Sequence, residues 1–170
     1  TDEAVSYHEF GRAMYRTSNV PAWLVCDSRF LWRYGLGMVR PMSLSVRRFV
    51  SIGYLYRENS IESLAYAMGV DPAGLVETVR RHGEFARSGV DADFGKGGNA
   101  YDRANGDAGE RPNPCLGPIE KPPFYAVRVE PTPLGTSLGL LTDEHGRVLD
   151  REAKPVRGLY AVGNDMHTPM

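Results

Sequence analysis

The sequence lacks several features that would assign it to a common class of protein. No apolar run reaches 18 residues, about the length that a membrane-spanning helix needs, so we expect no transmembrane segment. Its 20 basic and 21 acidic side chains leave a net charge of −1, which gives no electrostatic reason to expect binding to nucleic acid or to an anionic membrane surface. The pattern GxGxxG, by which many dinucleotide-binding domains hold a pyrophosphate, occurs nowhere.

Cysteine is scarce as well, and the two that are present, Cys26 and Cys115, lie far apart. Neither they nor the four scattered histidines have the spacing of a metal site, so we expect free thiols and no bound metal. Free thiols favour a reducing cytoplasm. Arginine outnumbers lysine 17 to 3, which is typical of bacterial proteins from GC-rich genomes.

What the sequence does contain is a mixture of helix and strand signals, which predicts an α+β fold with a core of ordinary size. Helices are expected where capping residues flank apolar residues at helical spacing. They run from Asp2 to about Arg16, from Asp27 or Ser28 to Gly35, from a capping box of Asn59 and Glu62 to Gly69, and from Asp71 to Gly89. Strands are expected over residues 22–26, 52–56, 124–129, 139–142, 147–149 and 159–162.

Residues 90–123 show no periodicity and are rich in glycine, proline, aspartate and asparagine. Loops of this length are uncommon inside compact domains and are usually functional or disordered. The embedded motifs Ala100-Tyr-Asp-Arg103 and Leu116-Gly-Pro118 favour an ordered connection that wraps around the domain.

The most informative segment is Gly158-Leu-Tyr-Ala-Val-Gly-Asn-Asp-Met166. The apolar run over residues 159–162 is typical of a strand that is buried on both faces, as in parallel sheets. Gly163 lets a ligand approach the backbone closely, and the Asn164 amide offers a donor and an acceptor where such a strand ends. We therefore expect a ligand contact at these two residues, although the motif alone also fits an ordinary turn.

From residue 99 onwards, five motifs follow one another. They are Asn99-Ala-Tyr-Asp-Arg103, Asn113-Pro-Cys-Leu-Gly-Pro118, Pro123-Phe-Tyr-Ala-Val127, Gly135-Thr-Ser-Leu-Gly-Leu140 and Gly158-Leu-Tyr-Ala-Val-Gly-Asn164. Together with Ala22-Trp-Leu-Val25, Asp27-Ser-Arg29 and Arg33-Tyr34, this ordered set resembles the flavoproteins of the fumarate reductase superfamily, and within it the 3-ketosteroid dehydrogenases.

The resemblance implies an FAD-dependent dehydrogenase that introduces a double bond next to a ketone. On this basis residues 1–122 form the catalytic cap domain, and residues 123–170 form an incomplete returning segment of the FAD-binding domain. The chain would be a fragment of a longer flavoprotein, inactive and without FAD on its own. Its returning strands would expose apolar surface or cover it by self-association.

The resemblance also implies roles for individual residues. Tyr34 is similar in position to the tyrosine base of the cap domain. Its ordinary pKa of about 10 calls for cationic or hydrogen-bonding help, for which Arg29 and Arg33 are candidates. The implied flavin contacts are Gly139, Gly163 and Asn164, and the implied substrate contacts are Gly135 and Thr136.

The expected substrate class follows from one position at which the sequence differs from the fumarate reductases. Gly135 stands where fumarate reductases have the histidine that binds a dicarboxylate, so the sequence favours a bulkier, neutral, steroid-like substrate. Its apolar pocket is expected to be lined by Trp23, Phe30, Trp32, Tyr34, Leu36 and Met38. Leu138 replaces the first glycine of the Gly-Gly pair common in ketosteroid dehydrogenases, so the substrate-side contour is expected to differ. Two alternatives remain open: a fumarate reductase-like enzyme that acts on another substrate, and a non-catalytic binding module made of the cap alone.

Overall fold

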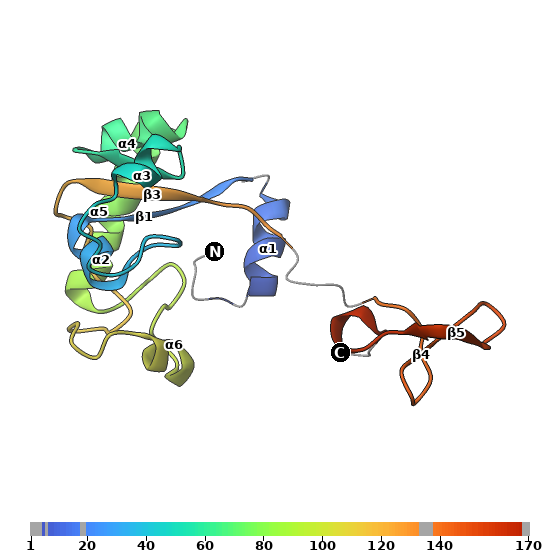
Figure 1. Ribbon diagram of the computed structural model, residues 1–170. Helices are drawn as coiled ribbons and strands as arrows, with labels where there is room; N and C mark the ends of the chain where they lie inside the picture. Colours follow the sequence, from blue (N-terminus) through green and yellow to red (C-terminus); the bar gives the residue numbers. More distant parts are fainter. Residues whose placement is uncertain (1–4, 6, 18–19, 133–137, 168–170) are drawn as a thin grey trace. The chain divides into compact units, whose positions relative to one another are not determined.

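The computed structural model describes residues 5, 7–17, 20–132 and 138–167 (Figure 1). The chain divides into two compact units, Thr1–Glu130 and Pro131–Met170. Helices and antiparallel strands are combined, so the mixed fold predicted from the sequence is confirmed. Each helix in the described ranges is too short or too polar for a bilayer crossing.

The first unit is built on a three-stranded antiparallel sheet in the order β1–β3–β2. The edge strands β1 (Ala22–Cys26) and β2 (Leu55–Glu58) both pair with the central strand β3 (Phe124–Val129). The first four residues of β3 are all buried, which requires layers on both faces of the sheet. The strand that we expected to begin the second segment is therefore the centre of the first unit.

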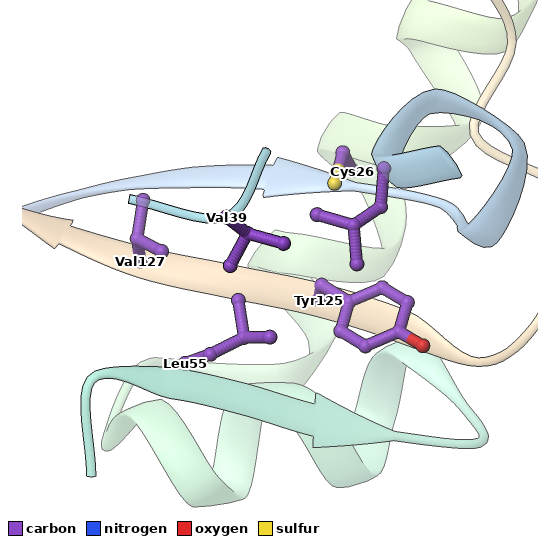
Figure 2. Close-up of a cluster of buried hydrophobic side chains, with 6 residues drawn as sticks. Cys26, Val39, Leu55, Tyr125 and Val127 are labelled. Atoms are coloured by element: carbon purple, nitrogen blue, oxygen red, sulfur yellow. The ribbon is translucent and has the colours of Figure 1, made fainter. Parts of the chain in front are cut away.

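One face of this sheet is covered by α2 (Ser28–Tyr34), by the loop that follows it and by α3 (Arg47–Ser51). Figure 2 shows side chains from all three strands meeting in the core cluster on this face. The buried members are Cys26, Leu31, Val39, Leu55, Tyr125 and Val127, and Leu36, Val46 and Phe49 pack against them.

The other face is covered by α4 (Ile61–Met68) and α5 (Pro72–Ser88). The alternation of side chains along the strands turns a second set of residues toward these helices. Its buried members are Leu64, Met68, Phe124 and Ala126. The result is a sheet between two layers, with α2 and the site residue Tyr34 on the first face.

Capping residues set the bounds of most helices where the sequence predicts them. Asp27 caps α2, and Asp71 caps α5 by accepting hydrogen bonds from two amides of its first turn. At their carboxyl ends α4 and α5 stop at Gly69 and Gly89, whose φ angles of 72° and 78° lie in the left-handed region. The helix expected near the start is described as α1 (Tyr7–Arg16).

Two predictions in this unit are wrong in detail. α4 is capped by Ser60, whose Oγ accepts a hydrogen bond from the Ser63 amide at 3.1 Å, and not by a capping box of Asn59 and Glu62. The strand expected over 52–56 begins only at Leu55, because α3 and the turn after it occupy the preceding residues.

The segment over residues 90–123 is ordered, as predicted. It contains α6 (Ala100–Asn105), which Asn99 caps. Two buried side chains hold the rest: Asp91 accepts hydrogen bonds from the amides of residues 93, 94 and 96, and Asn113 donates to the carbonyl oxygens of residues 89 and 96. Polar side chains thus take the place of the missing periodic structure.

The second unit contains β4 (Arg147–Leu149), β5 (Pro155–Tyr160) and the short 3₁₀ turn η1 (Gly163–Asp165). β4 and β5 form a two-stranded antiparallel sheet, and all residues of β5 are exposed. The predicted buried, parallel-type strand over residues 159–162 is therefore wrong. Residues 139–142 form isolated bridges instead of the predicted strand.

Candidate functional site

The residues predicted to form the site lie in different units. Tyr34 ends α2 in the first unit, whereas Gly139, Gly163 and Asn164 lie in the second. The predicted substrate contacts, Gly135 and Thr136, lie outside the described residues. Each candidate site is therefore built from the neighbours in its own unit.

In the first unit, the segment after α6 holds the amino-terminal end of α2. Asp27 is only 1% exposed, and its carboxylate accepts hydrogen bonds from the Phe30 amide at 2.9 Å and from the Glu120 and Lys121 amides at 3.3 and 3.2 Å. Ser28 donates from both its amide and its hydroxyl to the carbonyl oxygen of Lys121. One buried carboxylate thus caps the helix and anchors a segment more than 90 residues away in sequence.

The same segment holds the carboxyl-terminal end of α2. The Tyr34 hydroxyl donates a hydrogen bond to Asp107 Oδ2, which also receives Arg33 Nη2 at 2.7 Å. Arg33 Nη1 pairs with Glu110 at 3.2 Å. Because α2 is bound at both ends, the position of the Tyr34 hydroxyl is set by contacts with Asp107 and not only by the helix.

These contacts favour the neutral phenol. Desolvation and the hydrogen bond to Asp107 raise the pKa of Tyr34 to about 12, and the Arg33 cation opposes this only in part. The hydrogen bonds from Tyr34 and the Gly109 amide lower the pKa of Asp107 below its ordinary value. The expected cationic help is therefore present from Arg33 but is outweighed, so the net shift of the Tyr34 pKa is upward. Both guanidinium groups are engaged with carboxylates, Arg29 with Asp27 at 3.2 Å.

A groove of about 250 Å³ lies beside α2. It is lined by Ser28, Leu31, Trp32, Val39, Ser43, Leu44, Ser45, Val46 and Tyr125. Of the six side chains predicted to form an apolar pocket, only Trp32 lines it. Trp23 packs on the opposite face of the sheet against Tyr56, with ring centroids 4.9 Å apart.

In the second unit, the two predicted flavin-binding segments lie side by side. The Leu140 amide donates to the Asp165 carbonyl at 2.8 Å, and the His167 amide donates to the Leu140 carbonyl at 2.9 Å. Glycine is required at 139, because a Cβ atom there would lie 2.3 Å from the Asp165 carbonyl oxygen. The contact between Gly139 and the Gly163–Asp165 turn is a finding of the structure, and the role of these residues in flavin binding stays a prediction.

The turn itself is open. Gly163 has a φ of +60°, and a Cβ atom at this position would meet no atom within 4 Å. Asn164 is exposed beside it. A shallow depression of about 420 Å³ on this unit is lined by Leu138, Gly139, Leu140, Tyr160, Ala161 and Asp165. Backbone at this turn is thus accessible to a ligand.

The second unit also exposes many large apolar side chains, in agreement with the expectation that this segment exposes apolar surface. The exposed set comprises Leu138, Leu140, Leu141, Val156, Leu159, Tyr160 and Val162. Both cysteines are free thiols, and burial raises the pKa of Cys26 to about 12. The described residues contain no group of three histidine, cysteine or acidic side chains that is able to hold a metal ion.

Sequence reasoning missed Asp107 and Glu110. Both lie in a polar stretch with no motif, and Asp107 is 73 residues from the tyrosine that it contacts. From its local sequence, Asp27 is predicted to cap a helix. Nothing in the sequence indicates its long-range contacts with residues 120 and 121.

The family model described as FAD binding domain matches residues 1–170, and the chain belongs to this family. Among curated relatives, it is 43% identical over 154 residues to a 3-oxosteroid 1-dehydrogenase of Comamonas testosteroni, a match that covers 89% of this chain and 27% of the relative. It is 37% identical over 166 residues to a 4-oxocyclohex-2-ene-1-carboxylate 5-dehydrogenase of Sinomonas cyclohexanicum, covering 95% of this chain and 28% of the relative.

Solved structures agree. A 3-ketosteroid delta1-dehydrogenase from Sterolibacterium denitrificans, in complex with 1,4-androstadiene-3,17-dione, matches 97% of this chain and 31% of its own with a TM-score of 0.80 and 44% identity. A flavocytochrome c3 fumarate reductase shares the fold, with a TM-score of 0.65 and 24% identity over 96% of this chain and 24% of its own. The resemblance to the 3-ketosteroid dehydrogenases is thus confirmed, and the likeness to the fumarate reductase is one of fold. The chain spans 27–28% of the length of the curated relatives named above.

Proposed function

We propose that the protein is an FAD-dependent dehydrogenase that acts on a CH–CH group beside a ring ketone, with a 3-ketosteroid as its substrate. The observation that carries this proposal is the identity of 37–44% with ring-ketone dehydrogenases over nearly all of the chain. The relatives named for 3-oxosteroids support a steroid. The family match supports the cofactor.

The residues of the second unit fit contact with a flavin. Gly163 leaves the backbone open, and the exposed Asn164 amide supplies one donor and one acceptor group for a polar ring edge. Gly139 is proposed as a further cofactor contact, because its backbone packs closely against residues 165 and 166, next to the Gly163 turn. When bound, FAD supplies the acceptor for the hydride that leaves the substrate.

Tyr34 is proposed as the base that removes the acidic proton next to the ketone. Support comes from the exposure of the Tyr34 residue and from the hydrogen bond that its hydroxyl donates to the Asp107 carboxylate, which orients it. In this step the Tyr34 oxygen takes the substrate proton while its own proton passes to Asp107. The raised pKa of Tyr34 and the lowered pKa of Asp107 both oppose the transfer of a proton from Tyr34 to Asp107. The step therefore requires a polarised substrate carbonyl, which makes the substrate proton more acidic.

We also propose that the first unit is the catalytic cap domain and the second unit the returning segment of the FAD-binding domain. The exposed apolar side chains of β5 support this assignment, because a strand that belongs to a larger sheet has apolar side chains to bury. The division at Glu130 moves the proposed boundary from residue 122 to the end of β3.

A second candidate is a dehydrogenase of small oxocyclohexane carboxylates, which the match to the Sinomonas enzyme favours. A fumarate reductase-like activity rests on shared fold and is disfavoured by Gly135 at the position of the dicarboxylate-binding histidine. A non-catalytic module made of the cap alone is the third possibility.

Dye reduction by the purified intact protein separates these candidates. We expect flavin absorbance and reduction of the dye with a 3-ketosteroid but not with succinate. Turnover of succinate or fumarate without any response to steroids would refute the proposal. A response to 4-oxocyclohexanecarboxylate alone would favour the second candidate, and a protein without flavin or turnover would favour the non-catalytic module.

Tyr34→Phe tests the proposed base, since it keeps the ring and deletes only the hydroxyl. The turnover rate of the intact enzyme should fall by a factor on the order of 100 to 10,000 with full flavin content, and binding of a product-like steroid should change much less. Tyr66→Phe, at a tyrosine that is 75% exposed on α4, is the matched control. A normal rate in Tyr34→Phe assigns the base to another tyrosine.

A further inference from the structure

The charge of the chain is unevenly distributed. Residues 28–57 contain no aspartate or glutamate, although the whole chain has a net charge of −1. The same stretch holds six arginines, namely Arg29, Arg33, Arg40, Arg47, Arg48 and Arg57. It forms α2, the loop after it and α3, which build the layer on one face of the sheet, and most of the edge strand β2. Net charge alone conceals this local excess of positive charge.

Of these arginines, the three on the loop after α2 and on α3 are not neutralised by an acidic neighbour. Arg29 pairs with Asp27, and Arg33 is engaged by carboxylates after α6. Arg40, Arg47 and Arg48 are all exposed, and no acidic side chain in the described part of the chain forms an ion pair with them. They are therefore available to an anionic partner.

Large apolar side chains lie on the same layer. Trp32, Met42 and Leu44 are 52%, 66% and 95% exposed. The Met42 amide donates to the Trp32 carbonyl oxygen at 2.8 Å, and Trp32 and Leu44 line the same groove, so the loop folds beside α2. We call the set of Trp32, Arg40, Met42, Leu44, Arg47 and Arg48 the arginine–apolar surface.

We propose that the arginine–apolar surface docks the protein on an anionic lipid bilayer. Tryptophan and aliphatic side chains enter the boundary between headgroups and acyl chains, while arginines pair with lipid phosphates. Nucleic acid would match the cations but would leave Met42 and Leu44 exposed to water. A partner protein would need a cluster of acidic side chains around an apolar centre. An anionic bilayer offers negative headgroups and an apolar interior at every point of its surface.

The proposal does not depend on the proposed dehydrogenase activity. The protein would bind at the surface of the bilayer through the arginine–apolar surface, and such peripheral binding requires no membrane-spanning helix. Its electrostatic part predicts that salt weakens the interaction, because exposed charges are screened.

Vesicle sedimentation of the intact protein tests the electrostatic part. We expect binding to phosphatidylcholine vesicles that contain phosphatidylglycerol, weak binding to phosphatidylcholine alone, and release at high salt. The triple variant Arg40→Gln/Arg47→Gln/Arg48→Gln should bind about 100-fold more weakly, since each arginine near an anionic surface contributes about fivefold. The matched control is Arg16→Gln/Arg151→Gln/Arg157→Gln, which removes the same charge at exposed positions elsewhere and should bind nearly as the parent does.

Two apolar variants test the rest of the surface. Met42→Ser/Leu44→Ser should weaken vesicle binding on the order of tenfold without unfolding the protein, because both side chains are largely exposed. Val90→Ser/Phe94→Ser, at residues that are 64% and 56% exposed, is the control and should change little.

Three outcomes would overturn the proposal. One is the absence of binding to anionic vesicles, as expected if another part of the polypeptide or a second copy covers this surface. Another is an equal loss in the two arginine triples, which would mean that only net charge matters. The last is binding that neither set of surface substitutions weakens. Loss of a dimer in Met42→Ser/Leu44→Ser, without lipid binding by the parent, would identify a second copy as the occupant.

Discussion

Replacing Asp27 with alanine should destabilise the first unit more than the loss of an ordinary helix cap. The carboxylate is 1% exposed and accepts hydrogen bonds from three backbone amides, those of Phe30, Glu120 and Lys121. Loss of an N-cap costs about 1 kcal/mol. Each buried amide that loses its acceptor adds about 1–2 kcal/mol. We expect Asp27→Ala to lower the free energy of unfolding by about 3–5 kcal/mol, a large part of the stability of an ordinary domain.

The matched control is Asp71→Ala. Asp71 also caps a helix, accepting from Ala73 and Gly74 at 3.3 and 2.9 Å, but it is exposed and anchors no distant segment. Its loss should cost about 1 kcal/mol. Urea unfolding followed by tryptophan fluorescence measures both variants, because Trp23 and Trp32 both lie in the first unit. If Asp27→Ala lies within about 1 kcal/mol of Asp71→Ala, the anchoring role of the buried carboxylate is wrong.

Three further predictions follow from the geometry. Titration of Tyr34 by ultraviolet absorbance should show a pKa of about 12, and Asp107→Asn should lower this pKa because it removes the hydrogen bond to a carboxylate. The pKa of Tyr34 in the folded protein lies above the ordinary value of about 10. The contribution of this group to stability is therefore present below about pH 10 and is lost as the pH rises through 12. Gly139→Ala places a Cβ atom 2.3 Å from a backbone carbonyl and should lower the flavin content of the intact protein, whereas Gly117→Ala, with no atom within 4 Å, should not. Gly11→Ala, in the interior of α1 with equally open surroundings, should raise the free energy of unfolding measured in urea by about 0.5–1 kcal/mol, and a decrease would contradict the helix assignment there.

Local signals in the sequence predicted the helices well because their causes are local. Asp27, Asp71 and the glycines that end α4 and α5 act within one turn of the helix. The choice of Ser60 over Asn59 shows the limit of such signals, since neighbouring residues of similar capping propensity differ only in backbone geometry. At Ser60 the backbone is extended, with φ −133° and ψ 159°.

Strand bounds and burial were harder to predict because partners determine them. β2 begins at Leu55 because it pairs with Val127 of β3, far away in sequence. The apolar run over residues 159–162 predicted burial on both faces, yet β5 pairs with β4 in an antiparallel ribbon and is exposed. An apolar sequence indicates that a strand has side chains to bury, but the layer that buries them is specified elsewhere.

The candidate site divides in the same way. A local turn signal indicated Gly163 and Asn164, and the family resemblance indicated Gly139. The structure brings their two segments together, and their contact with a flavin stays a prediction. The surroundings of Tyr34 were not found. Its partner Asp107 belongs to an aperiodic segment, and desolvation and the hydrogen bond to Asp107 outweigh the lowering of the Tyr34 pKa by Arg33.

Helix α2 links the catalytic proposal to the lipid proposal, and substitutions on it separate them. Tyr34→Phe deletes a hydroxyl that the arginine–apolar surface does not use, so it should lower turnover and leave vesicle binding intact. The arginine triple should do the reverse in a soluble assay, because Arg40, Arg47 and Arg48 form no contact with Tyr34 or Asp107. Asp27→Ala releases the amino-terminal anchor of the helix that carries both Trp32 and Tyr34, so it should weaken both activities together. If Asp27→Ala unfolds the unit but leaves either activity unchanged in the intact protein, that activity does not reside on α2.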